Sequence, residues 1–243
     1  MRTIVVIQAR MGSTRLPGKV LERIADRPLV LWTVAAARAI PNVDRVVVAT
    51  TTDPADDPLV EVLKAAGVAH SRGPVRDVLT RTWDAVCPFD PDLVVRATAD
   101  NPFMDPVVVG GQIERCVDGS FDYVGTTGWP LGIAAEVARA AALGQAAAEA
   151  TDPAEREHVM PFLYGHPERF RIGSAAPSSP PPAGRFTVDT AEDLAFARAI
   201  AVRLGPGATS TIGALGAILD AEPELREINA GVRQKHWQET EQP

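Results

Sequence analysis

Residues Thr3–Lys19 read TIVVIQARMGSTRLPGK, an apolar run that passes directly into a polar loop. The run Thr3–Ile7 is short and rich in β-branched residues, which predicts a buried strand. The loop Gln8–Gly18 holds two glycines and, together with Lys19, three cations. In α/β proteins the ligands bind in loops at the carboxyl ends of strands. This stretch therefore predicts both the fold class and the position of a binding site.

The alternation of strand and helix patterns continues along the first half of the chain. Further apolar runs predict strands at 45–49, 93–95 and 121–124. Capping residues, prolines and apolar periodicity predict helices at 28–40, 57–67, 77–86 and 105–117. Continuous apolar strands separated by helices are typical of a mostly parallel sheet covered by helices on both faces. We therefore expect an α/β fold of this kind.

The regular alternation of strand and helix patterns ends at about Trp129. An alanine-rich helix is predicted at 137–150, a second helix at 152–164, a strand at 170–173, a proline-rich loop at 177–182 and a last strand at 186–188. No repeat or linker divides the chain, so we expect one domain over residues 1–243 with an inserted excursion at about 125–180. Its apolar, alanine-rich helices predict a homodimer interface.

Composition excludes several classes of protein. The chain has 24 Lys and Arg against 31 Asp and Glu, a net charge of −7, which disfavours binding to nucleic acids or anionic membranes. Its two cysteines form no metal-ligand or CxxC spacing, which indicates a reducing compartment. No apolar run approaches the roughly 18 residues of a membrane-spanning helix, and the N-terminal run is too short for a signal peptide. We expect a cytoplasmic protein.

The loop after the first strand has the chemistry of a phosphate site. Its glycines let backbone N–H groups approach an anion closely, while arginine and lysine side chains supply positive charge. The spacing of Gly12 and Gly18 is not that of a Walker A loop, and Val20 stands where such a loop has Ser or Thr. A polyphosphate is the best-fitting ligand; a solvated turn with incidental basic residues is the alternative.

Two acidic residues are candidate metal ligands. Asp100 follows the strand predicted at 93–95, where a carboxylate can hold a divalent ion over a phosphate. An Asx-turn before Pro102, made by Asp100 or Asn101, is the better explanation from this segment alone. Asp189 lies between the strand predicted at 186–188 and a helix N-cap at Thr190. A capping box and the helix dipole account for the next acids, Glu192 and Asp193, but not for Asp189.

Together these segments closely resemble the cytidylyltransferases that activate sugar acids, including the CMP-3-deoxy-manno-octulosonate and CMP-sialate synthetases. The nearest resemblance is to the spore-coat-polysaccharide type. The opening loop from Gln8 to Lys19 carries most of it. Further matching stretches, in the same order, are Arg72-Gly73, Asp77-Val78-Leu79 with Arg81, Glu155–Val159, and Asn229 followed by Gln234-Lys235.

The resemblance implies an Mg²⁺-dependent transfer of CMP from CTP to an acidic small-molecule acceptor, with release of pyrophosphate. The nucleotide-binding residues that it implies are Gln8, Ala9, Arg10, Gly12, Ser13, Arg15, Lys19, Arg72 and Asp77. It implies catalytic roles for Lys19, Arg10 and Asp100, a metal bound by Asp100 and Asp189, and an acceptor bound by Glu136, Glu157 and His158. It also places the acceptor site and the dimer interface in the excursion.

Several alternatives stay open. The family pattern has an acid where Ala134 stands, in the stretch Gly132–Glu136, so a sugar acid, a sugar phosphate and a phosphonate are all candidate acceptors. His158 can be a structural histidine instead of an acceptor ligand. A nucleotide-sugar glycosyltransferase is a rival function, although Asp100-Asn101-Pro102 is not the DxD motif of that class. A nucleotide-binding protein without catalysis is a second rival.

Overall fold

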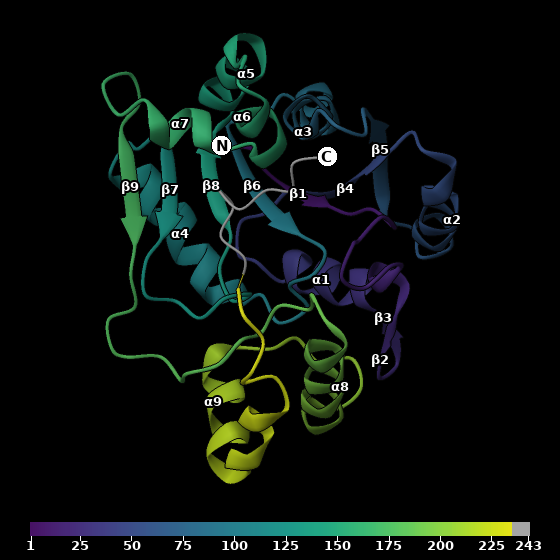
Figure 1. Ribbon diagram of the computed structural model, residues 1–243. Coiled ribbons are helices and arrows are strands. Elements are labelled where there is room, and N and C mark those ends of the chain that lie inside the picture. The colour runs from purple at the N-terminus through teal and green to yellow at the C-terminus, as the bar shows by residue number, and fades with distance from the viewer. Residues whose placement is uncertain (235–243) are drawn as a thin grey trace.

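The computed structural model describes residues 1–234, which form a central seven-stranded sheet with helices around it (Figure 1). The strand order is β5-β4-β1-β6-β8-β7-β9. The strands are β1 (Thr3–Gln8), β4 (Arg45–Thr51), β5 (Ala69–Gly73), β6 (Leu93–Thr98), β7 (Tyr123–Thr126), β8 (Glu136–Arg139) and β9 (Ile172–Ala175). Strand β8 runs antiparallel to both of its neighbours, and the other pairings are parallel. The predicted mostly parallel sheet is confirmed.

Helices cover both faces of this sheet, as expected. Side chains alternate along β1, so Val5 and Ile7 belong to one apolar cluster while Ile4 and Val6 belong to another. The first cluster is closed by α1 (Leu29–Arg38), α2 (Asp57–Ala65) and α4 (Pro106–Asp118). The second is closed by α3 (Val78–Val86), α5 (Ala140–Glu149) and α7 (Pro161–Gly165), while α6 (Pro153–His158) contributes no residue to it.

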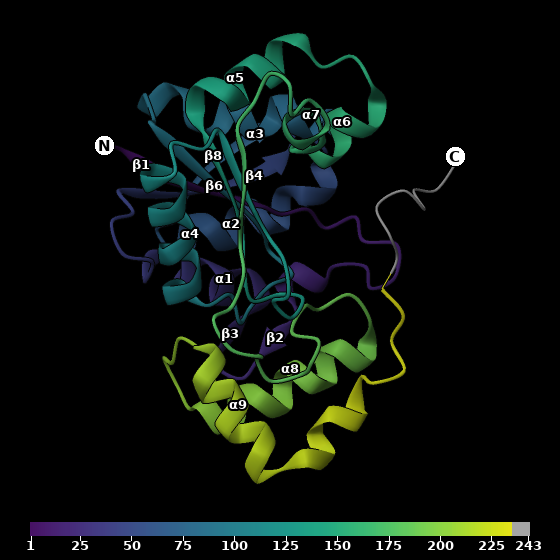
Figure 2. The ribbon, with the colours of Figure 1, turned by 90° about the vertical axis from the view of Figure 1, so that its left-hand side faces the viewer.

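The C-terminal part of the described chain forms a helical layer beyond one end of the sheet (Figure 2). It consists of α8 (Ala191–Leu204), α9 (Ile212–Ala221) and a 3₁₀ helix (Pro223–Ile228), and it packs near the short ladder of β2 (Arg23–Ile24) and β3 (Arg27–Pro28). A third apolar cluster, which includes Trp32, Phe186 and Phe196, fills this region. Helix α8 begins with the predicted capping box of Thr190 and Asp193.

The segment from 125 to 180, which we expected to be an inserted excursion, also contributes strands to the sheet. It supplies β8 and β9, and its helices α5 and α7 share one apolar cluster with α3. The predicted helix at 137–150 is wrong at its start, because Glu136–Arg139 pairs with β6 and β7 and α5 begins only at Ala140. A four-residue strand that leads directly into an alanine-rich helix is too short to show the alternating hydrophobic pattern by which a strand is recognised.

The strand expected at 186–188 is also wrong, because these residues are extended but join no sheet. Instead, the Phe186 amide donates to the Leu131 carbonyl (2.9 Å), and the Val188 amide donates to the Asp100 carbonyl (2.8 Å). Asp189 therefore reaches Asp100 through a loop contact and not through a neighbouring strand. Strand β5, which lies at the sheet edge and reads AHSRG, was not predicted because it lacks an apolar run. Among the described helices, none is long and apolar enough to cross a bilayer.

Candidate active site

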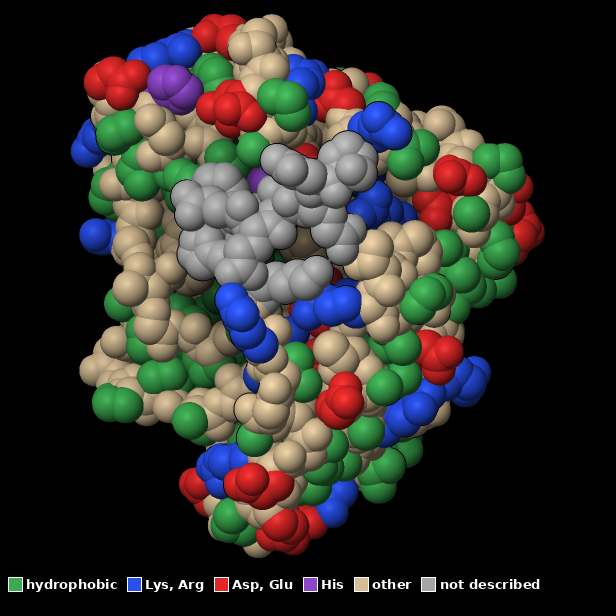
Figure 3. Space-filling model, in the orientation of Figure 1, with side chains coloured by type: hydrophobic (Ala, Val, Ile, Leu, Met, Phe, Trp, Pro, Cys, Tyr) green, Lys and Arg blue, Asp and Glu red, His purple; other side chains and the backbone are tan. Residues whose placement is uncertain are grey.

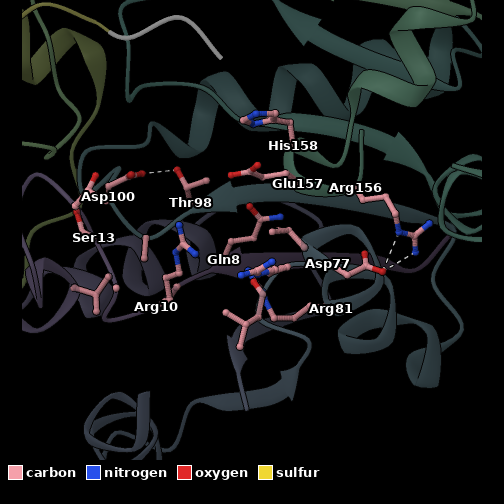
Figure 4. Close-up of a pocket in the computed structure, with 18 of the residues that line it drawn as sticks. Gln8, Arg10, Ser13, Asp77, Arg81, Thr98, Asp100, Arg156, Glu157 and His158 are labelled. Atoms are coloured by element: carbon pink, nitrogen blue, oxygen red, sulfur yellow. Dashed lines mark hydrogen bonds and ion pairs between the residues drawn. The ribbon is translucent and has the colours of Figure 1, made fainter. Parts of the chain in front are cut away.

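A cleft of about 1170 Å³ opens where β1 and β6 end, at the edge at which the sequence places the site. The two strand ends are in register, since the Ala99 amide donates to the Gln8 carbonyl at 2.9 Å. Figure 4 shows Ser13 and Asp100 at one end, Asp77 and Arg156 at the other, and Glu157 and His158 facing Gln8 and Arg10 across it. The lining residues that the sequence had singled out are Gln8, Ala9, Arg10, Gly12, Ser13, Arg15, Lys19, Asp77, Asp100, Glu157 and His158.

The predicted phosphate loop is held in shape by a buried carboxylate that sequence reasoning missed. Asp56, which is 2% exposed, accepts hydrogen bonds from the Met11 amide (2.6 Å) and the Thr51 amide (3.2 Å). The loop then closes on itself, because the Gly18 amide donates to the Met11 carbonyl at 2.9 Å and Gly18 has a left-handed φ of 73°. Glycine adopts that conformation without steric cost.

Lys19, at the end of this loop, connects the two predicted metal ligands. Its Nζ lies 3.0 Å from Asp100 Oδ2 and 2.8 Å from Asp189 Oδ1, and it also donates to the Val188 carbonyl at 2.8 Å. Burial alone lowers the pKa of Lys19, but the two carboxylates outweigh it and the pKa is raised. Burial alone raises the pKa of Asp189, but Lys19 and neighbouring arginines lower it below its usual value.

The remaining oxygens of the two carboxylates are held by other side chains. Thr98 donates to Asp100 Oδ1, and Arg185 donates to Asp189 Oδ2 at 2.6 Å. The oxygens that face each other share one cation, the Lys19 ammonium, so this donor pair fits a divalent ion in the same place. Among residues 1–234 no group of three or more His, Cys, Asp or Glu is arranged to hold a metal. An ion here needs further oxygens from a ligand, as Mg²⁺ at phosphates does.

The cleft carries more positive than negative charge. Its lining cations are Arg10, Arg15, Lys19, Arg76, Arg81 and Arg156, against the acids Asp77, Asp100 and Glu157. Arg10 and Arg76 make no hydrogen bond or ion pair with any other residue that the structure describes. Lys and Arg side chains gather near the middle of the face shown in Figure 3. Because the lining cations outnumber the lining acids, the cleft is suited to an anionic ligand.

The end of the cleft away from Lys19 is a rigid corner. Asp77 caps α3 by accepting from the Thr80 amide (2.9 Å), and Arg156 Nε donates to Asp77 Oδ2 at 2.9 Å. Arg156 also donates to the Ala150 carbonyl at 2.6 Å, which ties α6 to the end of α5. Arg81 is 3% exposed, and burial together with the nearby Arg10 charge lowers its pKa. Sequence reasoning did not name Arg81 and Arg156 as site residues. Both lie in stretches that resemble the family, and that resemblance could have identified them.

Two of the three predicted acceptor residues line the cleft and the third does not. Glu157 and His158 end α6, and burial lowers the pKa of His158. The following residue, Val159, is fully buried at a φ of 74° and ψ of −58°, a strained γ-turn closed by a 2.9 Å hydrogen bond from the Met160 amide to the His158 carbonyl. Such strain persists only where surrounding packing enforces it.

Glu136 lies in β8 behind the lining residues. Its carboxylate accepts from Arg96 NH1 (2.5 Å) and from the Tyr123 hydroxyl (2.7 Å). Arg96 NH2 in turn donates to Gln8 Oε1 at 2.9 Å, and Gln8 Nε2 donates to Thr82 Oγ1 at 2.8 Å. Glu136 therefore reaches the cleft only through Arg96 and Gln8.

The structure does not bring Arg72 to the cleft. Its guanidinium donates to the Thr51 carbonyl (2.7 Å), the Asp53 carbonyl (2.8 Å) and the Asp57 carboxylate (2.6 Å). These contacts join β5 to the start of α2, which is a structural role at the sheet edge. Of the last family-like stretch, Asn229 and Gln234 are described, and Lys235 lies outside the described residues.

Comparisons with known proteins agree with this geometry. Residues 4–202 match the family described as Cytidylyltransferase. An uncharacterized protein of Methanocaldococcus jannaschii is 33% identical over 244 residues, which cover 100% of both chains. The spore coat polysaccharide biosynthesis protein SpsF of Bacillus subtilis is 32% identical over 228 residues, 91% of this chain and 95% of that one.

A solved structure shows the same architecture. It is a cytidylyltransferase from Leptospira borgpetersenii, which superposes with a TM-score of 0.86 at 25% identity and covers 97% of this chain and 100% of its own. The family match spans most of the sequence, and the relatives align over nearly their full lengths. This chain therefore belongs to the cytidylyltransferase family.

Proposed function

We propose that this enzyme transfers CMP from CTP to an acidic sugar or a related phosphate or phosphonate, with release of pyrophosphate. The observation that carries the proposal is the arrangement of one cleft. A glycine-containing basic loop meets the Asp100–Lys19–Asp189 cluster at one end, while Glu157 and His158 lie further along it. A triphosphate and an acceptor can thus lie side by side, which bimolecular transfer requires.

The reaction is a displacement at the α-phosphorus of CTP. An acceptor oxygen forms a bond to this phosphorus, the bond from phosphorus to the bridging oxygen breaks, and pyrophosphate leaves with the electron pair. Arg10, which has no partner among the described residues, supplies a guanidinium fork for phosphate oxygens. Lys19 and Arg15 place further positive charge where negative charge grows on the leaving group. Preorganised charge of this kind supplies much of the rate enhancement in phosphoryl-type transfer.

Mg²⁺ is the ion we propose, held by Asp100 and Asp189. When bound, it supplies a Lewis acid that neutralises charge on the phosphate oxygens. Asp100 and Asp189 would hold it through the carboxylate oxygens that contact Lys19 in this structure. Because both oxygens bind Lys19 in this structure, we propose that Lys19 turns from the carboxylates to the triphosphate when the ion binds.

Net positive charge in the cleft supports an acidic acceptor. After Asp77 pairs with Arg156, Arg76 is left without a partner among the described residues. A carboxylate, phosphate or phosphonate on the acceptor would complement it, and Glu157 and His158 can bind hydroxyl groups. The similarity to a spore coat polysaccharide protein supports a sugar over other acids.

A screen of all four nucleoside triphosphates against a pool of acidic sugars, sugar phosphates and phosphonates tests this function, with pyrophosphate release as the readout. We expect release with CTP and Mg²⁺ only when an acidic acceptor is present. Asp100→Asn protein is the negative control. A glycosyltransferase would instead consume a nucleotide sugar without releasing pyrophosphate, and a non-catalytic binding protein would bind CTP without turnover. Either result would exclude the proposed reaction.

We further propose a cytoplasmic homodimer of single-domain chains. The alanine-rich helix α5 and its neighbours α6 and α7 offer an outer surface for a second copy. Light scattering coupled to gel filtration at micromolar concentration tests the oligomeric state. A mass of one chain, 25.8 kDa, would contradict the dimer.

A further inference from the structure

The two oxygens of Asp189 have different partners. Oδ1 lies 2.8 Å from Lys19 Nζ and 3.1 Å from Arg15 Nη2, and both of these side chains line the cleft. Oδ2 accepts from Arg185 Nη2 at 2.6 Å. A carboxylate anchored through one oxygen cannot rotate freely about its last torsion. Arg185 therefore helps to fix the orientation of the Asp189 carboxylate beside Lys19 and Asp100.

Arg185 is itself fixed by a buried carboxylate. Its Nε donates to Asp193 Oδ1 at 2.9 Å, and Asp193 is fully buried. The other oxygen of Asp193 accepts from the backbone amides of Asp189 (3.0 Å) and Thr190 (3.2 Å). Asp193 thus holds the backbone of Asp189, while Arg185 holds its side chain. Asp193 and Arg185 together therefore fix both the backbone and the side chain of Asp189, the candidate metal ligand.

A third group closes the network from a distant part of the chain. Asn229, which is 5% exposed, donates through Nδ2 to Asp193 Oδ1 (3.0 Å) and to the Arg185 carbonyl (3.1 Å). Arg185 NH1 also donates to the Gln234 side chain. Asn229 and Gln234 lie in the last stretch by which the sequence resembles its family, a stretch to which the cleft gives no role.

Capping of helix α8 does not account for these contacts. The capping box needs only Thr190 and Asp193, whose side chains satisfy each other's backbone amides. It requires neither a guanidinium bridging Asp193 to Asp189 nor an amide that supports this guanidinium from behind. Arg185 has a bidentate geometry that links two carboxylates, which a lysine cannot reproduce. Arg185 and Asn229 are explained if the function of the site requires Asp189 Oδ1 to be held in one position.

We propose that Arg185 and Asn229 are positioning residues that hold Asp189 Oδ1 toward Asp100 Oδ2, so that both oxygens can bind one divalent ion. Neither residue lines the cleft. The proposal rests on the proposed function, because the ion is the one that accompanies CTP. Supporting groups of this kind typically change metal affinity about 10- to 100-fold when removed.

Mn²⁺ binding provides a direct test that does not depend on turnover. Equilibrium dialysis of Mn²⁺ against full-length protein, saturated with a non-hydrolysable α,β-methylene analogue of CTP, gives the affinity of the ion. We expect Arg185→Gln to weaken Mn²⁺ binding at least about tenfold, and Arg185→Lys to recover part of the loss. Arg203→Gln is the matched control, because Arg203 lies in the last turn of α8 and pairs with Glu222 at the end of α9, and neither residue lines the cleft. The Mn²⁺ affinity of this variant should equal that of the wild type.

A double variant separates positioning from general damage. If Arg185 acts through Asp189, then Arg185→Gln combined with Asp189→Asn binds Mn²⁺ no more weakly than Asp189→Asn alone. Losses that multiply would overturn the proposal, as would an unchanged affinity in Arg185→Gln. Asn229→Ala, a milder change, should weaken binding in the same direction, and circular dichroism verifies folding of each variant. If Arg185→Gln does not fold, Asn229→Ala decides the question by the same criteria.

The same measurement distinguishes this inference from the proposed function. Wild-type protein that binds Mn²⁺ with the analogue, together with Arg185→Gln protein that binds it equally well, would overturn only the positioning role. Wild-type protein that binds no Mn²⁺ in the presence of the analogue would overturn both.

Discussion

Lys19 Nζ lies 2.8 Å from Asp189 Oδ1, although 170 residues separate the two along the chain. The same ammonium lies 3.0 Å from Asp100 Oδ2. Two carboxylates that converge at a sheet edge repel each other unless a cation lies between them. Sequence reasoning identified that cation as Mg²⁺, and in this structure the Lys19 ammonium occupies the position. In the site that we propose, one position serves two cations in turn, which makes nucleotide, metal and lysine interdependent.

Replacement of Lys19 by methionine should destabilise the protein in the absence of metal. Lys19 is 8% exposed, and its loss leaves two facing carboxylates without their shared cation. Removal of one partner from a buried ion pair costs about 3 kcal/mol. We expect a fall in melting temperature of about 2–4 °C for each kcal/mol lost, with partial recovery on addition of Mg²⁺. Lys64→Met, which removes an exposed pair with Glu61, is the control and should change little.

Asp100→Asn and Asp189→Asn should each reduce kcat severely, while the double variant should be little worse than either single one. In the proposed site the two carboxylates bind the same ion, so removal of one ligand already disables it, and residues that act as a unit are not additive. Steady-state pyrophosphate release with saturating CTP measures the effect. Two losses that multiply independently, or a fully active Asp189→Asn enzyme, would contradict a shared metal.

Gly132→Ala should damage the site from a distance. Gly132 has a φ of 94°, and a Cβ there would lie 2.5 Å from the Phe186 carbonyl carbon and 2.6 Å from the Thr187 nitrogen. Either the backbone near 186–187 moves, which displaces Asp189, or the fold loses at least about 2 kcal/mol. Urea denaturation and kcat should both respond. Gly111→Ala places a Cβ in open space on helix α4, so the same two measurements should show no loss.

His158 should make stability depend on pH between its folded pKa and about 6.5. Burial lowers the pKa of His158 in the folded protein, so near pH 6 the unfolded chain binds more protons than the folded one. The free energy of unfolding contributed by this group therefore falls as pH decreases from its unfolded pKa and levels off below the folded one. Urea denaturation from pH 5 to pH 8 measures this slope. We expect a smaller slope in His158→Gln, and an identical slope would show that His158 is not responsible.

Local pattern was sufficient to predict the mostly parallel core of the sheet. Strands β1, β4 and β6 are continuous apolar runs because both of their faces are buried under helices. Strands β5 and β8 were missed for the opposite reason. An edge strand that reads AHSRG lacks an apolar run, and Glu136–Arg139 becomes a strand only because β6 and β7 lie on either side of it. Such pairing depends on residues distant in sequence, which no local window contains.

The sequence by itself determined which residue types meet a phosphate, because a strand followed by a glycine-containing basic loop creates that chemistry within about 17 residues. It also identified Asp189 as an acid without a local structural role, and the family resemblance added Asp100 as the second candidate metal ligand. Only the tertiary structure decided how they meet. Val188 hydrogen-bonds to the Asp100 backbone, Arg185 and Asn229 orient the carboxylate of Asp189, and Arg72 is held at the sheet edge by Asp57. Hydrogen bonds between side chains act over a few ångströms in space, and the path of the folded backbone alone determines which residues come within that reach.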